Sequence, residues 1–270
     1  MSRPPAAVAA VAVRRLEERH AGLDVPLLVQ PEWARHMPWL AQGVTWRGED
    51  DDFDLGLFGD TVTRTAFDRW RRLRSALQLD GAVHARQVHG ARVLRHDHTI
   101  RGLLVADAAD GHVTRAAGLL LTVSVADCVP VSIVDPDRRA IALLHAGWRG
   151  LAAGMVESGI QALVDACGSA PDRLQLHLGP AICGECYEVG PEVHERLGLE
   201  APGLPAPVDL RAVAAARARD AGIRADAVTR SAFCPRCHDD RFFSHRAGSA
   251  GRQMAVLGIR ADDARQPTSV

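Results

Sequence analysis

The sequence contains no lysine and no asparagine, and it has a single tyrosine among 270 residues. Arginine and alanine fill those places, a bias of base composition that says nothing about function. A surplus of either charge is also missing, because the formal net charge is -1. The chain therefore lacks the positive excess that gathers counterions from a nucleic acid or an anionic bilayer. We expect neither a nucleic acid nor a membrane as a partner.

Long apolar runs are absent as well. The run over residues 116–126 ends at Asp127, well short of the roughly 20 residues that a membrane-spanning helix needs. The Ala/Val run at residues 6–13 is followed at once by charged residues and lacks the leucine-rich core of a secretion signal. We expect residues 1–30 to form a frayed tail or an amphipathic helix.

Cysteine is sparse, with six residues in the chain, which is too few for a disulfide scaffold. Two pairs have Cys-x-x-Cys spacing: Cys183 with Cys186, and Cys234 with Cys237. In a reducing compartment this spacing more often serves metal or redox chemistry than a structural disulfide. The cysteine usage therefore favours a cytoplasmic protein. From spacing alone, the two pairs would form a credible four-thiolate zinc site.

The apolar fraction of 47% is enough for a full hydrophobic core, which we interpret as one domain over residues 31–262 with a short tail at 263–270. Short β-branched runs at residues 119–125, 131–134 and 140–144 predict adjacent buried strands. Spacings of three and four predict helices at 62–77 and 151–167, and Asp209 is expected to cap a surface helix over 210–221. We therefore predict an α/β (α+β) sandwich with mixed β-sheets flanked by helices.

Three polar side chains each stand at the end of an apolar run: His89, Cys128 and His145. A lone histidine or cysteine in such a place is usually a core residue. Two imidazoles and one thiolate together form a ligand set suited to Zn²⁺, and three protein ligands leave the fourth position open for water or substrate. Because long stretches of sequence separate the three residues, their spacing alone leaves both interpretations open.

Six blocks of sequence resemble the laccase-domain family. They are QVHG at 87–90, ADGHVT at 109–114, ADCVP at 126–130, HAGWRGLAAG at 145–154, LGPAICGECYEVG at 178–190 and RFFSHR at 241–246. The blocks occur in family order and extend the resemblance over roughly residues 43 to 258. Members of this family were described first as polyphenol oxidases and later as purine nucleoside phosphorylases with adenosine deaminase activity.

The resemblance implies a metal ion, zinc or alternatively copper, bound by His89, Cys128 and His145. It implies cleavage of adenosine or inosine, and by extension methylthioadenosine, with phosphate to give free base and ribose 1-phosphate. A metal-bound water attacking C6 of adenine would account for a deaminase activity. We expect a monomer or a small homo-oligomer. The family commonly lacks a cluster of the two cysteine pairs, so the resemblance does not support a second metal site.

Arg149 and Gly150 follow His145 at the expected start of a helix, where free N–H groups and the helix dipole favour an anion. Phosphate binding by Arg149 and an ion pair with a carboxylate are equally compatible with this pattern. Further candidates for contacts with phosphate, ribose or the wall of the site are Arg47, Arg71, Tyr187 and Arg246.

Three positions depart from the family pattern. The loop at 54–60 is shortened and lacks an asparagine, Trp70-Arg71 replaces an Asn-Arg pair, and His245 replaces a tyrosine. All three lie outside the proposed ligands, so they concern substrate contacts rather than the metal.

Other classes of function use the same residues. A copper oxidase of phenols would use the same three ligands, although a multicopper enzyme needs many more histidines than this sequence groups together. A metal-free hydrolase would use Cys128 as nucleophile and His145 as base. A zinc-stabilised binding module without catalysis is a further alternative. The metal content of the purified protein separates these alternatives.

Overall fold

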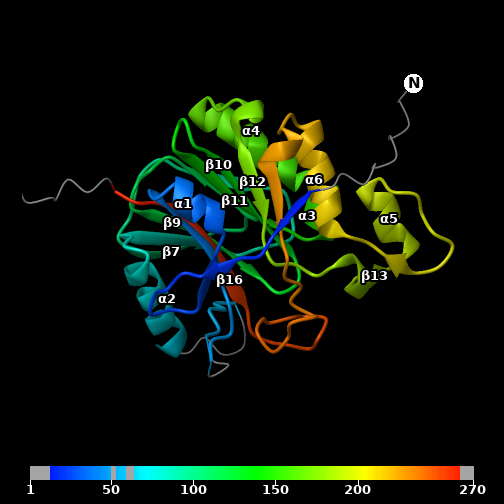
Figure 1. The fold of residues 1–270 in the computed structure, drawn as a ribbon, viewed down its shortest axis with the longest axis horizontal. Helices are drawn as coiled ribbons and strands as arrows, with labels where there is room; N and C mark the ends of the chain where they lie inside the picture. The colour runs from blue at the N-terminus through cyan, green and yellow to red at the C-terminus, as the bar shows by residue number, and fades with distance from the viewer. Residues whose placement is uncertain (1–12, 50–52, 59–63, 262–270) are drawn as a thin grey trace, which may run out of the picture.

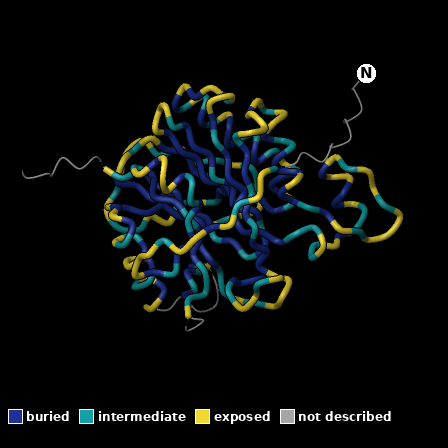
Figure 2. The backbone as a smooth tube through the Cα atoms, in the orientation of Figure 1, coloured by how far each residue is buried: buried dark blue, intermediate teal, exposed yellow. Residues whose placement is uncertain are grey.

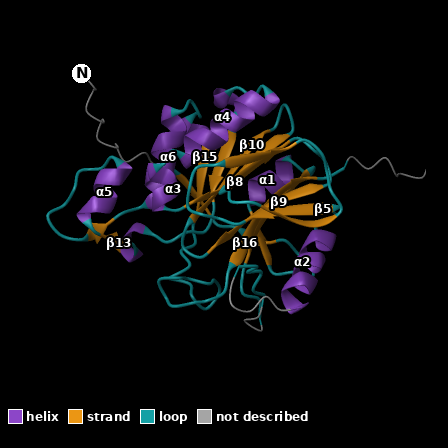
Figure 3. Ribbon diagram, turned by 180° about the vertical axis from the view of Figure 1, so that it is seen from behind, coloured by secondary structure: helices purple, strands orange, loops and turns teal. Residues whose placement is uncertain are grey.

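The fold consists of two stacked β-sheets with helices on their outer faces (Figures 1 and 3). It is described by a computed structural model over residues 13–49, 53–58 and 64–261. The first sheet contains, in spatial order, β1 (Arg14–Leu16), β15 (Val228–Ser231), β12 (Gln175–Leu178), β10 (Val129–Asp135), β11 (Ala140–Ala146), β8 (Gly111–Thr114) and β6 (Val93–His96). The second contains β2 (Arg19–His20), β3 (Leu27–Val29), β4 (Leu40–Thr45), β16 (Gln253–Ile259), β9 (Leu119–Val125), β5 (Gly81–Ala85) and β7 (Gly102–Ala106).

Both sheets mix parallel and antiparallel pairs; for example, β12 runs parallel to β15 and antiparallel to β10. A small hairpin pairs β13 (Glu188–Val189) with β14 (Ala206–Pro207). The α-helices are α1 (Pro31–His36), α2 (Arg64–Ala76), α3 (Trp148–Ala152), α4 (Met155–Cys167), α5 (Pro191–Leu197) and α6 (Leu210–Asp220). Short 3₁₀ turns occupy Pro171–Arg173, Gly184–Cys186 and Ala225–Ala227. The expected α/β sandwich with mixed sheets is confirmed.

Strand β11 shows how the layers share their apolar core. Successive side chains of a strand point to opposite faces. Ala142 and Leu144 accordingly pack with α3, α4 and α6, whereas Ile141 and Leu143 pack between the two sheets. His145 continues the inward-facing set, so the strand delivers its imidazole to the space between the sheets. Figure 2 shows the sheets as the buried centre of the molecule.

The opposite face of the second sheet is covered by α2, whose Trp70 and Leu73 pack with Leu120 of β9 and Val256 of β16. The indole N–H of Trp70 donates to the carbonyl of Leu55 at 3.0 Å, so this buried polar group is satisfied. The layers therefore run helix, sheet, sheet, helix, and the helices α5 and α2 lie at opposite ends of the view in Figure 1.

Several predicted elements are confirmed, with bounds that differ by a few residues at most. The predicted helix at 151–167 is divided between α3 and α4, and α4 ends at Gly168, whose φ of 65° lies in the left-handed region that glycine tolerates. Asp209 caps α6 by accepting from the N–H groups of Arg211 and Ala212. Cys167 is buried at the end of α4, as expected of a core residue.

Three expectations need correction. Within the expected tail, residues 14–29 form β1, β2 and β3 rather than a frayed end or a helix, because each strand pairs with the edge of a sheet; residues 1–12 and the tail at 263–270 lie outside the described residues. The strand at 119–125 is not in the same sheet as the other two, since β9 pairs with β16 and β5. Helix α6 is no simple surface helix, since it buries Leu210, Val213 and Ala214 against the first sheet.

Among the described residues, each helix is too short or too polar to cross a membrane.

Candidate metal centre

The two sheets bring His89, Cys128 and His145 together, and their ligand atoms all lie within 4.8 Å of one another. His89 lies in the turn after β5, Cys128 in the connection between β9 and β10, and His145 near the end of β11. The two imidazoles meet edge to face, with ring centroids 4.8 Å apart. His145 is buried, Cys128 is partly exposed and His89 is exposed. The cluster is therefore anchored in the core and open to solvent on one side.

A buried carboxylate that the sequence analysis did not single out orders this cluster. Asp110 accepts hydrogen bonds from the backbone N–H groups of Val88, His89 and Gly90 at 3.1, 2.9 and 2.8 Å. Its Oδ1 also lies 2.9 Å from Nδ1 of His145. Because Nδ1 is engaged there, Nε2 of His145 is left for a ligand, the arrangement found where a carboxylate orients a metal-binding histidine.

The charges of the cluster favour a thiolate. Burial raises the pKa of Cys128, but the adjacent imidazoles of His145 and His89 outweigh it and bring this pKa down to about 6. Burial lowers the pKa of His145, but the Cys128 thiolate and Asp110 outweigh that effect and raise it to about 9. Without a metal, the two groups therefore form a thiolate–imidazolium pair at neutral pH. A metal ion would replace the proton on His145.

The backbone is strained on both sides of the cluster. His89 has a φ of 59° and Asp127 a φ of 86°, in the left-handed region that residues other than glycine rarely adopt. Each strained residue is held from outside: His89 by its bond to Asp110, and Asp127 by the N–H of Arg246, which donates to its Oδ2 at 2.8 Å. Such strain persists where the surroundings over-determine it, and it is common at functional sites.

Gly147 leaves room for the ligands. A Cβ atom at this position would lie 2.9 Å from Sγ of Cys128 and 3.2 Å from Cδ2 of His89. The φ of Gly147 is -78°, which any residue can adopt, so the requirement for glycine comes from space alone. The backbone at the start of α3 therefore packs directly against two of the three candidate ligands.

The donor set fits a metal such as zinc on chemical grounds. It combines two imidazole nitrogens with one thiol whose pKa is already lowered, the borderline-soft combination that zinc accepts. Three donors with one open side correspond to catalytic zinc sites, whereas structural sites are closed by four donors. These residues could hold a metal ion and leave one position for a substrate or water.

Two of the predicted contact residues lie beside the cluster. The guanidinium of Arg246 lies over the ring of Tyr187, 4.8 Å from its centroid. Burial raises the pKa of Tyr187 and the negative charge of Cys128 adds to the rise, while the cations of Arg246 and Arg149 oppose it. Cys128, Arg246 and Arg149 therefore all lie within electrostatic range of Tyr187.

Arg149 is exposed on α3, with its guanidinium 4.4 Å from the Trp148 ring centroid. No carboxylate of the described residues lies within ion-pair distance of Arg149. The sequence left two roles open for Arg149, phosphate binding and an ion pair with a carboxylate. The described residues form no such ion pair with Arg149. Helix α3 has only five residues, so its dipole is short and the side chain itself must supply most of any attraction for an anion.

The structure uses the other two predicted arginines differently. Arg47 donates to the carbonyl of Phe242 and to the hydroxyl of Ser249, at 3.0 and 2.8 Å, and so holds the 242–249 loop. Arg71 lies on the exposed side of α2 and pairs with Asp68 at 3.1 Å. A separate cleft of about 640 Å³ is lined by residues including Arg14, Glu32 and Asp226. None of the three candidate ligands lines this cleft.

We expect Gly147→Ala to weaken zinc binding by roughly tenfold to a hundredfold, the usual cost of disturbing the immediate support of a metal ligand. The added methyl group would push Sγ of Cys128 and the His89 ring apart without removing a donor. Competition with a chromophoric chelator measures the affinity. Gly203→Ala, whose Cβ would meet nothing within 4 Å, is the matched control and should bind zinc like the wild type. Equal affinities in both variants would contradict this geometry.

A second expectation concerns the reactivity of Cys128 in the metal-free protein. Because its pKa is about 6, its alkylation by iodoacetamide should reach a plateau above pH 7 and be about tenfold slower at pH 5. Cys167, whose pKa is raised by burial, serves as the internal control and should react slowly over the same range. Mass spectrometry of the peptides follows both sites, and zinc should protect Cys128. A rate that rises only above pH 8 would rule out the thiolate–imidazolium pair.

Comparison with known proteins finds relatives that match most of the chain. A purine nucleoside phosphorylase of Xylella fastidiosa is 35% identical over 215 residues, which is 75% of this chain and 81% of that protein. Adenosine deaminase RL5, from an unknown prokaryotic organism, is 35% identical over 209 residues, covering 70% of this chain and 79% of its own.

Solved structures share the fold. The crystal structure of YlmD from Geobacillus stearothermophilus superposes with a TM-score of 0.80 at 27% identity, covering 92% of this chain and all of that one. The Bacillus licheniformis hypothetical protein YfiH gives a TM-score of 0.79 at 26% identity, over 88% of this chain and 98% of its own. The sequence model of the family described as "Multi-copper polyphenol oxidoreductase laccase" matches residues 42–260. The resemblance noted in the sequence is thus confirmed, and the chain belongs to this laccase-like family.

Proposed function

We propose that His89, Cys128 and His145 bind a zinc ion, and that the protein is a purine nucleoside phosphorylase acting on adenosine or inosine. The observation that carries the proposal is the three-donor cluster, anchored by Asp110 and open on one side. The names of two relatives, a purine nucleoside phosphorylase and an adenosine deaminase, support purine nucleosides as the substrate class. Methylthioadenosine is a further candidate substrate of the same class.

The reaction requires an oxygen of phosphate to attack C1′ of the ribose while the bond from C1′ to N9 of the purine breaks. The base leaves with the electron pair and takes up a proton, and ribose 1-phosphate remains. When bound, zinc supplies a Lewis acid or an activated water in such a site. Deamination would instead use water as the nucleophile at C6, with loss of ammonia. On this proposal the two reactions share one site.

The residues of the chain have separate tasks in this proposal. Asp110 fixes the ring of His145 and the turn that carries His89. The guanidinium groups of Arg149 and Arg246, both within electrostatic range of Tyr187, would supply the positive charge that receives phosphate. The ring of Tyr187 forms part of the wall beside them.

A copper oxidase is supported less well than a phosphorylase by this set of ligands. Reduction of oxygen to water needs four electrons and therefore several coppers, with many more histidine ligands than one mononuclear site provides. Among residues 13–49, 53–58 and 64–261, the one group of three or more candidate ligands that includes histidine is the cluster already described. The ligand count thus favours phosphorolysis over oxidation.

A metal-free cysteine hydrolase is the second candidate, and one observation favours it. In such a hydrolase His145 would act as the base that takes the proton of Cys128, which leaves a thiolate nucleophile beside an imidazolium oriented by Asp110. That activity would survive chelation, would be lost on alkylation of Cys128, and would not need phosphate.

Product analysis tests the proposal. Adenosine or inosine should yield free base only when phosphate is present, equally under air and under argon, while deamination of adenosine should be independent of phosphate because water is the nucleophile. Both activities should fall together in Cys128→Ala and on removal of the metal, and Cys167→Ala should keep both. Oxidation of a phenol in air by copper-loaded protein, with no base released, would instead identify an oxidase.

The role of Arg149 has its own test. Arg149→Ala should raise the KM for phosphate by about tenfold to a hundredfold, since a charge-assisted hydrogen bond contributes about 1.5–3 kcal/mol, and it should change the KM for nucleoside much less. Arg95→Ala, which removes an exposed arginine paired with Asp97, is the control for a general loss of positive charge. An unchanged phosphate KM in Arg149→Ala would assign Arg149 to structure.

A further inference from the structure

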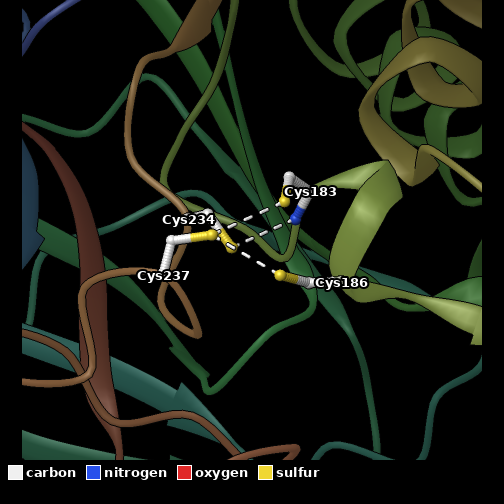
Figure 4. A group of neighbouring side chains, drawn as sticks. All are labelled: Cys183, Cys186, Cys234 and Cys237. Carbon is white, nitrogen blue, oxygen red and sulfur yellow. Dashed lines mark hydrogen bonds between the residues drawn. The ribbon is translucent and has the colours of Figure 1, made fainter.

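A second group of candidate ligands is formed by the two Cys-x-x-Cys pairs. Cys183, Cys186, Cys234 and Cys237 converge so that their sulfur atoms all lie within 4.8 Å of one another. Figure 4 shows the first pair on one segment, the second pair on another, and all four sulfurs directed into the space between them. About 50 residues of sequence separate the pairs, and the fold alone brings them together.

The spacing of the sulfurs suits a tetrahedral ion. With zinc–sulfur bonds of about 2.3 Å, neighbouring sulfurs of a tetrahedral site lie about 3.8 Å apart. Sγ of Cys237 lies 3.8 Å from Sγ of Cys183 and 3.5 Å from Sγ of Cys186. All four cysteines are free thiols in this structure. Little rearrangement is therefore needed to place one ion among four sulfurs.

Backbone donors and a buried cation lie next to the sulfurs. The backbone N–H of Cys183 donates to Sγ of Cys234 at 3.3 Å, and the backbone of Cys237 also hydrogen-bonds this sulfur. The buried guanidinium of Arg211 interacts electrostatically with Cys183 and Cys234, so positive charge faces the sulfurs from α6. Zinc with four thiolates carries a net charge of about -2, which such donors and cations offset.

The four cysteines join the two segments that border the candidate metal centre. Cys186 is followed directly by Tyr187, and the segment after Cys237 leads to Arg246, whose guanidinium lies over the Tyr187 ring. Both segments also contact the Asp127 position: Ile182 donates to its carbonyl at 3.0 Å, and the N–H of Arg246 to its carboxylate at 2.8 Å. An ion bound by the four cysteines would therefore also hold the segments that contain Tyr187 and Arg246.

We propose that Cys183, Cys186, Cys234 and Cys237 bind a structural zinc ion, separate from the histidine-containing site, that ties residues 182–188 to residues 234–246. The site is closed by four donors and has no open position, so it holds structure and performs no chemistry. Its effect on the candidate active site is to position Tyr187 and Arg246. The proposal does not depend on which reaction the protein catalyses.

Elemental analysis of the purified full chain tests the site. Wild type should contain about two zinc ions per chain, and Cys237→Ser and Cys128→Ala should each contain about one. Cys237→His should keep the second ion, because imidazole replaces thiolate in three-cysteine, one-histidine zinc sites and Cys237 is exposed enough to admit the ring. Cys167→Ser is the matched control for loss of a thiol outside both groups, and it should contain as much zinc as wild type.

Two further readouts separate a structural ion from a general failure to fold. In cobalt-substituted protein, the strong sulfur-to-cobalt absorption of a four-thiolate site should be lost in Cys237→Ser and persist in Cys128→Ala. Hydrogen exchange should speed up in residues 182–188 and 234–246 of Cys237→Ser while the strands of both sheets stay protected. Unchanged zinc content and exchange in folded Cys237→Ser would overturn the proposal, as would a disulfide between these cysteines in protein freshly purified in the presence of a reductant.

Discussion

The architecture of the candidate active site depends on one buried carboxylate. Asp110 precedes β8 in the first sheet, yet it accepts three backbone N–H groups from the turn that follows β5 in the second. The same carboxylate orients His145. A buried charge is costly unless it is fully hydrogen-bonded, so Asp110 stabilises the fold only while these donors stay in place. The hydrogen bonds that stabilise the buried carboxylate therefore also fix the positions of His89 and His145 relative to each other.

The other supports of the site act in the same way, each through a contact from a distant part of the chain. The strained backbone at Asp127 is held by the N–H of Arg246, and the loop that contains Arg246 is held in turn by Arg47. Gly147 lets α3 approach the ligands closely. A rigid scaffold that fixes donors before any ligand arrives reduces the reorganisation required on binding, which is the general advantage of a preorganised site.

The sequence predicted the elements better than it predicted their partners. Local periodicity marked the strands at 119–125 and 140–144 because their buried runs are continuous, but it could not reveal that they belong to opposite sheets. The charged strand residues Arg14, Arg15 and Arg19 gave no such signal, because they lie at exposed sheet edges. Asp110 stands within the ADGHVT block, but a single aspartate carries no mark of burial. The spacing of the two cysteine pairs suggested a four-thiolate site, but only the tertiary fold shows that the pairs converge.

The place of β16 has a consequence for how the chain is made. This strand, the last one described, lies between β4 and β9 in the middle of its sheet. A nascent chain emerging from the ribosome therefore carries His89, Cys128 and His145 long before the second sheet can close. Until residues 253–259 emerge, the apolar edges of β4 and β9 have no partner, and exposed edges of this kind invite association with other chains. Synthesis of β16 thus removes two exposed edges at once and protects the second sheet against such association.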